Sequence, residues 1–148
     1  MAKMIQKDLG LSIKDFVYEI KPRSGIAVIG GDSSSGKTLY YKIKHEICKL
    51  KGEDKYLFIN HDTEDRLEKV FNGEIKDKIV IIDNADAIIP NDDHIRALLE
   101  ESENQYLIFG RDVGRYCYNL DDYANMVERE KGHFTMKYLL KEKGELWQ

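Results

Sequence analysis

Four short runs of continuous apolar residues constrain the folding of this chain more than any other feature. A strand with one face in water alternates apolar and polar residues, whereas a strand buried on both faces is apolar throughout. These runs are of the second kind and predict a mostly parallel sheet with helices on both faces. The runs are Ile26–Gly30, Tyr56–Asn60, Ile79–Asp83 and Tyr106–Gly110.

The segments between these runs have the residue spacing of helices. In the first segment, apolar residues recur every three or four positions, and Gly52 follows where a helix commonly ends. The two others open with acidic residues, which favour the start of a helix. Alternating strands and helices predict an α/β fold. The predicted helices cover Lys37–Lys51, run from Asp62 or Thr63 to Phe71, and cover Asp92–Glu101.

Both ends of the chain depart from that alternation. Near the N-terminus, the segment Asp15–Ile20 predicts an extra edge strand. Near the C-terminus, apolar and polar residues alternate over Phe134–Leu140, and Lys131-Gly132 is suited to turn this strand back on Tyr123–Glu130. A C-terminal β-hairpin is therefore predicted, with a helix over Leu120–Glu130 as the alternative.

Size, charge and cysteine content narrow the class of protein. A chain of 148 residues fits one domain, residues 1–148. Its formal net charge of −4 gives no bulk signature of nucleic-acid binding. Cys48 and Cys117 lack the spacing of a metal or redox pair. No apolar stretch suits a membrane span or a signal peptide, so we expect a cytoplasmic protein with no membrane association.

The segment after the first apolar run matches the pattern GxxxxGK[ST]. Glycines let such a loop wrap a phosphate group, backbone amides at a helix start bind it, and the lysine reaches the outer phosphates. The hydroxyl that follows the lysine coordinates Mg²⁺. We therefore predict a phosphate-binding loop, extended by Leu39 at its helical end. The matching residues are Gly31, Asp32, Ser33, Ser34, Ser35, Gly36, Lys37 and Thr38.

A second element of the same chemistry is the acid at the end of the third apolar run. Asp83 follows four apolar residues, Ile79 to Ile82. A carboxylate at such a strand end can orient a water molecule bound to Mg²⁺. With the loop, it predicts a metal site made by Thr38 and Asp83.

Together these elements resemble the P-loop NTPase superfamily. The loop is similar to its Walker A motif and Ile79–Asp83 to its Walker B motif, and the resemblance covers roughly Gly25 to Arg111. The order of elements resembles the additional-strand division that includes AAA+ ATPases. The resemblance implies a three-layer sandwich with a mostly parallel central sheet of strand order 5-1-4-3-2, and ATP and Mg²⁺ as ligands.

Two positions depart from the pattern of that superfamily. Catalytic members usually carry Glu after the Walker B Asp, but here Asn84 stands there, and an amide cannot accept a proton. Asp86 would replace it only if the chain turns back. Beyond the fourth run, Arg111 is a candidate contact for the γ-phosphate or a finger toward a neighbour, with a surface salt bridge as the alternative. Arg115 would reach the same charge if the segment turns.

The identity of the base is argued from missing motifs. Neither Asn-Lys-x-Asp nor DxxG, both typical of guanine-specific members, occurs after Lys37, so ATP is favoured over GTP. Four tyrosines are candidates to pack on adenine, although aromatic residues at helical spacing more often belong to the core. They are Tyr40, Tyr41, Tyr116 and Tyr118.

Three functions fit these observations. The first is an ATP-binding protein that hydrolyses ATP slowly or only with a protein partner or a second copy of itself. The second is a nucleoside or nucleotide kinase, although the scattered arginines give it no clear acceptor pocket. The third is a sensor that binds ATP without hydrolysis, which Asn84 makes credible.

Overall fold

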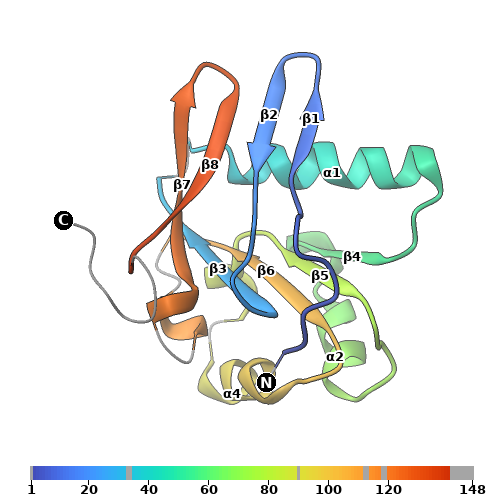
Figure 1. The fold of residues 1–148 in the computed structure, drawn as a ribbon. Coiled ribbons are helices and arrows are strands. Elements are labelled where there is room, and N and C mark those ends of the chain that lie inside the picture. The colour runs from blue at the N-terminus through green and yellow to red at the C-terminus, as the bar shows by residue number, and fades with distance from the viewer. Residues whose placement is uncertain (1, 33–34, 90, 112–113, 118–119, 141–148) are drawn as a thin grey trace.

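The computed structural model describes residues 2–32, 35–89, 91–111, 114–117 and 120–140. These residues form one eight-stranded sheet with the strand order β1-β2-β8-β7-β3-β6-β5-β4 (Figure 1). The strands are β1 (Leu11–Ile13), β2 (Phe16–Glu19), β3 (Ile26–Gly30), β4 (Tyr56–Ile59), β5 (Ile79–Ile82), β6 (Gln105–Phe109), β7 (Tyr123–Glu130) and β8 (His133–Tyr138). The helices are α1 (Lys37–Lys51), α2 (Asp65–Phe71), α3 (Ala85–Ile88) and α4 (Asp92–Glu100), with single 3-10 turns at His61–Thr63, Gly114–Tyr116 and Leu120–Asp122.

Half of the sheet, which we call the central half, consists of β3, β6, β5 and β4. These strands are parallel to their neighbours, and every residue of β3, β5 and β6 is buried. Such complete burial explains why the four apolar runs show no alternation. All four runs are therefore strands.

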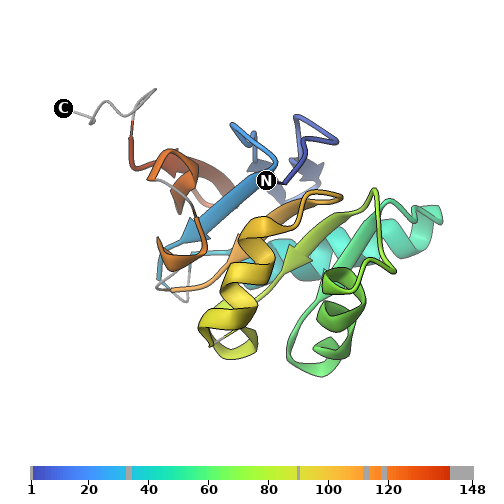
Figure 2. The same cartoon turned by 90° about the horizontal axis from the view of Figure 1, so that it is seen from below.

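Helices lie on both faces of the central half. Figures 1 and 2 show α1 on one face and α2 and α4 on the other. Helix α1 has the predicted bounds, and the backbone N–H of Gly52 caps it by donating to the carbonyls of Cys48 and Lys49. Helix α2 starts later than predicted because His61–Thr63 forms its own 3-10 turn, which Asn60 caps. Helix α4 ends at Glu100, and the Asn91 side chain caps its start by accepting from the His94 amide.

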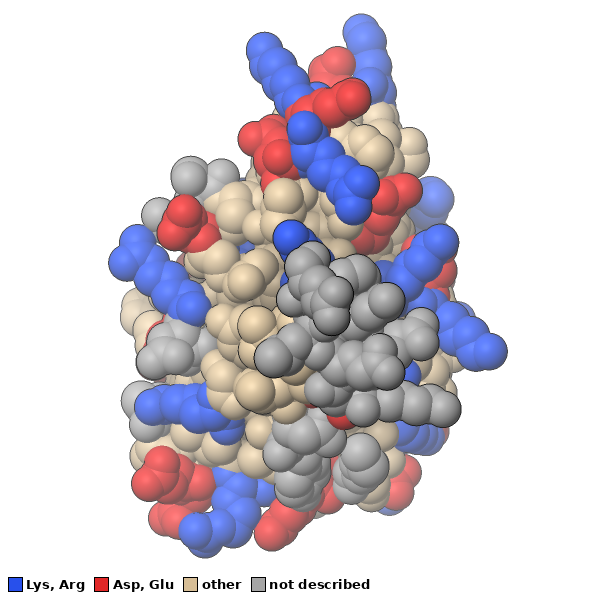
Figure 3. All heavy atoms as spheres, turned by 60° about the vertical axis from the view of Figure 1, so that its left-hand side comes forward, with Lys and Arg blue, Asp and Glu red and all other residues tan. Residues whose placement is uncertain are grey.

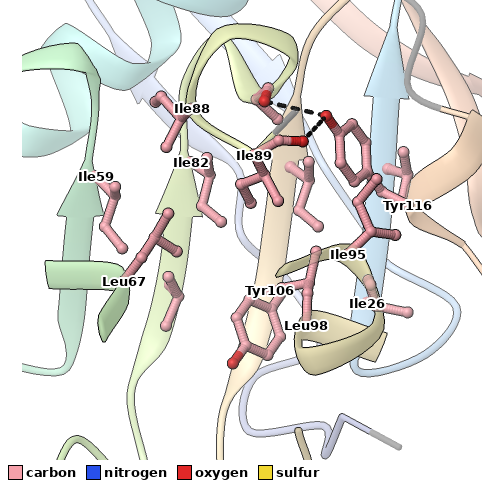
Figure 4. Close-up of a cluster of buried hydrophobic side chains, with 14 of the residues drawn as sticks. Ile26, Ile59, Leu67, Ile82, Ile88, Ile89, Ile95, Leu98, Tyr106 and Tyr116 are labelled. Atoms are coloured by element: carbon pink, nitrogen blue, oxygen red, sulfur yellow. Dashed lines mark hydrogen bonds between the residues drawn. The ribbon is translucent and has the colours of Figure 1, made fainter. Parts of the chain in front are cut away.

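The core beneath α2 and α4 is drawn in Figure 4. Ile59, Ile82 and Tyr106 from neighbouring strands meet Leu67 and Leu98 from the two helices. Each of these side chains is at most 5% exposed. Burial of an aliphatic side chain contributes about 1.5–3 kcal/mol, so this layer holds the helices to the sheet.

The other four strands, which we call the hairpin half, form two antiparallel hairpins. The pairs are β1 with β2 and β7 with β8. The hairpins join through parallel pairing of β2 with β8, and β7 pairs in parallel with β3 of the central half. In Figure 1 both hairpins project beyond the central strands.

This architecture contradicts the predicted fold class and, with it, the resemblance to P-loop NTPases. The predicted parallel sheet between two helical layers does not extend beyond the central half, because the chain forms a mixed sheet that curls into a half-barrel, with two antiparallel hairpins and few helices. Helices α2 and α4 lie over the central half, and among the described residues no helix covers that face of the hairpin half (Figures 1 and 2). The apolar runs predict which segments form buried strands. The position of the two hairpins depends on contacts between segments far apart in the sequence, and no apolar run predicts those contacts.

The predictions for the chain ends also need correction. The segment predicted as an edge strand contains β2, which is an inner strand because β1 and β8 flank it. Its Tyr18 ring stacks on Phe134, with centroids 4.6 Å apart, and this contact gives β2 a buried neighbour. The short strand β1 was not predicted, since only Leu11 of its three residues is partly buried. At the C-terminal end, β7 and β8 form a hairpin, and 123–130 is strand rather than helix.

The outer surface adds two observations. Among the described helices, none combines the length and the apolar character that a membrane crossing needs. On the face drawn in Figure 3, acidic and basic side chains are interspersed, including at the projecting end at the top of the view.

Candidate functional site

The predicted phosphate-binding loop connects β3 to α1. Its backbone turns at Asp32, whose carbonyl accepts hydrogen bonds from the Ser35 amide at 3.0 Å and the Ser35 hydroxyl at 2.6 Å. Gly36 ends the loop with φ +93°, and a Cβ atom there would lie 2.4 Å from the Phe134 ring. The close approach of Phe134 therefore requires glycine at this position. Ser33 and Ser34, which belong to the predicted loop, lie outside the described residues.

Lys37 lies within this loop rather than in solvent. Its side chain is buried, and its ammonium group donates to the carbonyls of Gly31 at 2.8 Å and Asp32 at 2.7 Å and to the Ser35 hydroxyl at 2.8 Å. All three partners are neutral. Burial lowers the pKa of the Lys37 ammonium, and the nearby Asp32 carboxylate opposes that shift. A desolvated cation bonded only to neutral oxygens is a strong site for an incoming anion.

Thr38 and Asp83 face each other beside this lysine. The Thr38 hydroxyl is 3.2 and 3.3 Å from the two carboxylate oxygens of Asp83, which follows β5. Burial raises the pKa of the Asp83 carboxyl, while the hydrogen bond from Thr38 lowers it. A hydroxyl and a carboxylate are hard oxygen ligands, and Mg²⁺ takes few protein ligands beside phosphate and water. These two side chains therefore fit the predicted Mg²⁺.

The next three predicted residues meet at the ends of β5 and β6. Asn84 has the left-handed backbone conformation, φ 56°, which Asn tolerates better than most residues, and its side chain is exposed. Asp86 accepts a hydrogen bond from the backbone amide of Arg111 at 2.7 Å. That contact supports the segment after β6 and uses one oxygen of Asp86. The Arg111 side chain is exposed.

One cavity of about 470 Å³ brings six of the predicted site residues together. Its lining comes from the start of α1 and from the ends of β5 and β6, where the carboxyl ends of neighbouring parallel strands meet at one edge of the sheet. The lining residues are Lys37, Thr38, Asp83, Asn84, Asp86, Gly110 and Arg111.

The other predicted residues lie outside this cavity. Gly31, Asp32 and Ser35 line an adjoining cavity of about 800 Å³, which Arg111 also lines. Leu39 lies in a third cavity. Arg115 donates to the Ile89 carbonyl at 3.1 Å and lines neither the cavity of about 470 Å³ nor that of about 800 Å³.

Three of the four tyrosines named as candidates to pack on adenine belong to the core, as aromatic residues at helical spacing more often do. Tyr40 is fully buried and its hydroxyl donates to the Leu9 carbonyl at 2.6 Å. Tyr41 is buried against Phe58. The fully buried Tyr116 donates to the carbonyls of Ala85 and Ile89, as Figure 4 shows. Tyr118 lies outside the described residues.

The sequence predictions missed the residues of the hairpin half that border the loop. Phe16, Glu128 and Phe134 line a cavity of about 770 Å³ together with Gly36 and Thr38. The alternation around Phe134 predicted its strand, but no sequence signal indicated that this strand would lie against the loop.

Searches against protein-family models, curated proteins and solved structures found no match for this chain.

Proposed function

We propose that this chain binds ATP together with Mg²⁺ at the loop Gly31–Thr38, and that it hydrolyses ATP slowly or only with a partner. The observation that carries the proposal is the meeting of Thr38 and Asp83, 3.2 Å apart, beside the buried ammonium group of Lys37 in one cavity. A phosphate-binding cation and a pair of hard oxygen ligands at one place suit a phosphate chain that carries a divalent metal.

The loop supplies the contacts to phosphate in this proposal. Lys37 exchanges its hydrogen bonds with neutral oxygens for charge-assisted bonds to phosphate, which are stronger. The start of the 15-residue helix α1 adds the positive end of a helix dipole. Arg111, exposed at the cavity, is the proposed contact for the outer phosphates.

Thr38 and Asp83 hold the metal in this proposal. When bound, Mg²⁺ would neutralise charge on the phosphate oxygens. The protein holds the Asp83 carboxylate at the site by its position directly after the fully buried strand β5 and by the hydrogen bond from Thr38.

Slow hydrolysis follows from the polar groups beside the metal ligands. The Asn84 amide can orient a water molecule but cannot take its proton. Asp86 already accepts the Arg111 amide, so this carboxylate has a structural contact to keep. The same contact favours, as a second candidate, a sensor that binds ATP without hydrolysing it. Partner dependence and a cytoplasmic location remain predictions from the sequence.

The test is a calorimetric titration of ATP with and without Mg²⁺. We expect wild-type protein to bind Mg²⁺-ATP at least about tenfold more tightly than metal-free ATP, since two ligands of the ion come from the protein. Thr38→Val preserves the shape of this exposed side chain but removes one of the two ligands, so the preference should shrink, whereas Thr38→Ser should retain it. Absence of ATP binding to wild type, or a preference unchanged in Thr38→Val, would contradict the proposal.

A further inference from the structure

The cavity of about 770 Å³ beside the loop has no role in the function proposed above. It shares Gly36 and Thr38 with the loop, so it is continuous with the place where the phosphates would lie. Its other walls come from both hairpins and from the first turn of α1. The side chains that form them are Asp15, Phe16, Leu39, Glu128, Lys131 and Phe134.

One wall of this cavity is held rigidly against the loop. Phe134 is buried and stacks on Tyr18, with the ring planes 10° apart. The Tyr18 hydroxyl donates to the Gly36 carbonyl at 2.8 Å, and the Phe134 ring fills the space where a Cβ atom of residue 36 would be. Two independent contacts therefore tie the wall to the end of the loop.

The turn between β7 and β8 packs tightly against the turn between β1 and β2. Gly132 has φ +81°, and a Cβ atom there would lie 2.2 Å from the Asp15 carbonyl oxygen, so the two hairpin turns touch. The Gly132 amide donates to a carboxylate oxygen of Glu128 at 3.0 Å, which fixes the direction of that side chain.

The lining combines half-exposed apolar side chains with one oriented acceptor, the Glu128 carboxylate. Phe16 and Leu39 are partly exposed, although both are large and apolar. Water-exposed apolar surface next to an oriented carboxylate suits a flat heterocycle with apolar faces and a hydrogen-bond donor at its edge. Adenine is such a group, because its amino group can donate to a carboxylate.

We infer that this cavity binds the adenine base of the nucleotide whose phosphates occupy the loop, with the base stacked on Phe16 and its amino group donating to Glu128. The inference rests on the proposed function, because the shared residues Gly36 and Thr38 make the two sites parts of one ligand. It extends that function by assigning the specificity for the base to the hairpin half.

The test compares three ligands, each with Mg²⁺: ATP, inorganic triphosphate, and ITP, which has a keto oxygen in place of the amino group. Stacking on an aromatic side chain contributes enough that Phe16→Ala should weaken ATP binding about tenfold. Binding of triphosphate should stay within about twofold, since it has no base to stack. Wild type should prefer ATP to ITP, and Glu128→Ala should remove that preference.

Two further variants keep the test decisive. Val17→Ala changes the neighbouring residue of β2, which is absent from the cavity lining, and should leave all affinities unchanged. Phe16→Leu keeps an apolar side chain for the fold but removes the aromatic face, so it should weaken ATP and spare triphosphate even if Phe16→Ala unfolds.

The outcomes separate this inference from the proposed function. If wild type binds triphosphate but ATP no more tightly, or if Phe16→Leu leaves ATP binding intact or weakens both ligands equally, the base site is wrong and the phosphate site stands. Equal binding of ATP and ITP overturns the role of Glu128. If neither ATP nor triphosphate binds, the proposed function itself fails.

Discussion

Buried polar side chains lie at both ends of strand β6, but their surroundings differ. At the amino end, the buried Gln105 side chain accepts hydrogen bonds from the amides of Ile5 at 2.9 Å and Gln6 at 2.8 Å, and it donates to the Gln6 carbonyl. Its neighbour Asn104 accepts from the Lys78 amide and donates to the Ile75 carbonyl. Asn104 also donates to the Glu101 carboxylate at 2.9 Å, and the other partners named here are neutral backbone groups.

The carboxyl end of β6 faces charged groups whose ionisation is perturbed by burial. Burial lowers the pKa of Lys37 and raises that of Asp83, so each is held in an environment that disfavours its charged form. Arg111, which follows this end of β6, lines the same cavity. Buried polarity alone therefore does not mark a functional site. Desolvated charge around open space is the feature that distinguishes the two ends.

The amino end should matter for stability and not for binding. Gln105→Ala leaves two backbone amides and one carbonyl without their partner, which should lower the free energy of unfolding by about 2–4 kcal/mol. Chemical denaturation measures this loss, and Gln105→Glu, which keeps an acceptor for the two amides, should lose less. ATP affinity should be unchanged below the melting transition. A variant that loses affinity as well would remove the distinction between the two ends.

The carboxyl end should show the reverse behaviour. Lys37→Ala removes a charge-assisted contact to phosphate and should cost about 1.5–3 kcal/mol of ATP binding, measured by calorimetry. Lys49→Ala, which removes an exposed lysine from the last turn of α1, is the matched control and should bind as wild type does. Saturating ATP should raise the melting temperature of wild type and of the control far more than that of Lys37→Ala. Equal affinity in all three proteins would refute the role of the loop.

A third substitution adds a carboxylate to the cavity at the carboxyl end of β6. Asn84→Asp keeps a residue that tolerates φ 56° and supplies a proton acceptor beside the metal ligands. ATP hydrolysis should rise about tenfold, equivalent to roughly 1.4 kcal/mol of barrier, in a single-turnover assay of phosphate release. Asn84→Gly tolerates the same backbone without a carboxylate and should not gain activity. Brisk turnover by wild type with no gain in Asn84→Asp would show that Asn84 is not the limiting group.

The smallest effect is expected for Asp83, whose charged form should lower the stability of the ligand-free fold. Its pKa is raised in the folded protein, so this carboxyl stabilises the fold below its ordinary pKa and that contribution is lost as pH rises. Asp83→Asn should therefore raise the melting temperature of the ligand-free protein near neutral pH and less so at about pH 4.5. The same variant should lose the Mg²⁺-dependent stabilisation by ATP. A lower melting temperature at neutral pH would mean that the charge stabilises the fold.

The sequence predicted the local elements better than their assembly. The buried runs that became β3, β5 and β6 and the periodicity of α1 are properties of neighbouring residues, so they can be recognised without the rest of the chain. The parallel pairing of β2 with β8 joins the two ends of the chain, and neither segment carries a signal for the other. The resemblance to P-loop NTPases failed for a related reason, because a short loop motif specifies a local turn and not the sheet around it.

The same limit applies to the candidate site. Its residues could be predicted from the sequence, but the contacts between them could not. The motif and the acid at a strand end predicted the residues that line one cavity, Lys37, Thr38 and Asp83. The sequence could not predict that Asp86 would accept a hydrogen bond from the Arg111 amide, because that contact depends on where the segments after two neighbouring strands meet. The packing of Phe134 against Gly36 was hidden for the same reason.

That packing has a consequence for the order in which the protein is made. Residues emerge from the ribosome from the N-terminus onward, so the loop and its helix are synthesised long before Phe134. Until β8 has emerged, Gly36 lacks its aromatic neighbour and Tyr18 lacks the ring on which it stacks. A nascent chain therefore carries every residue of the loop while the wall that supports it is still missing, and the candidate site is complete only after β8 has emerged.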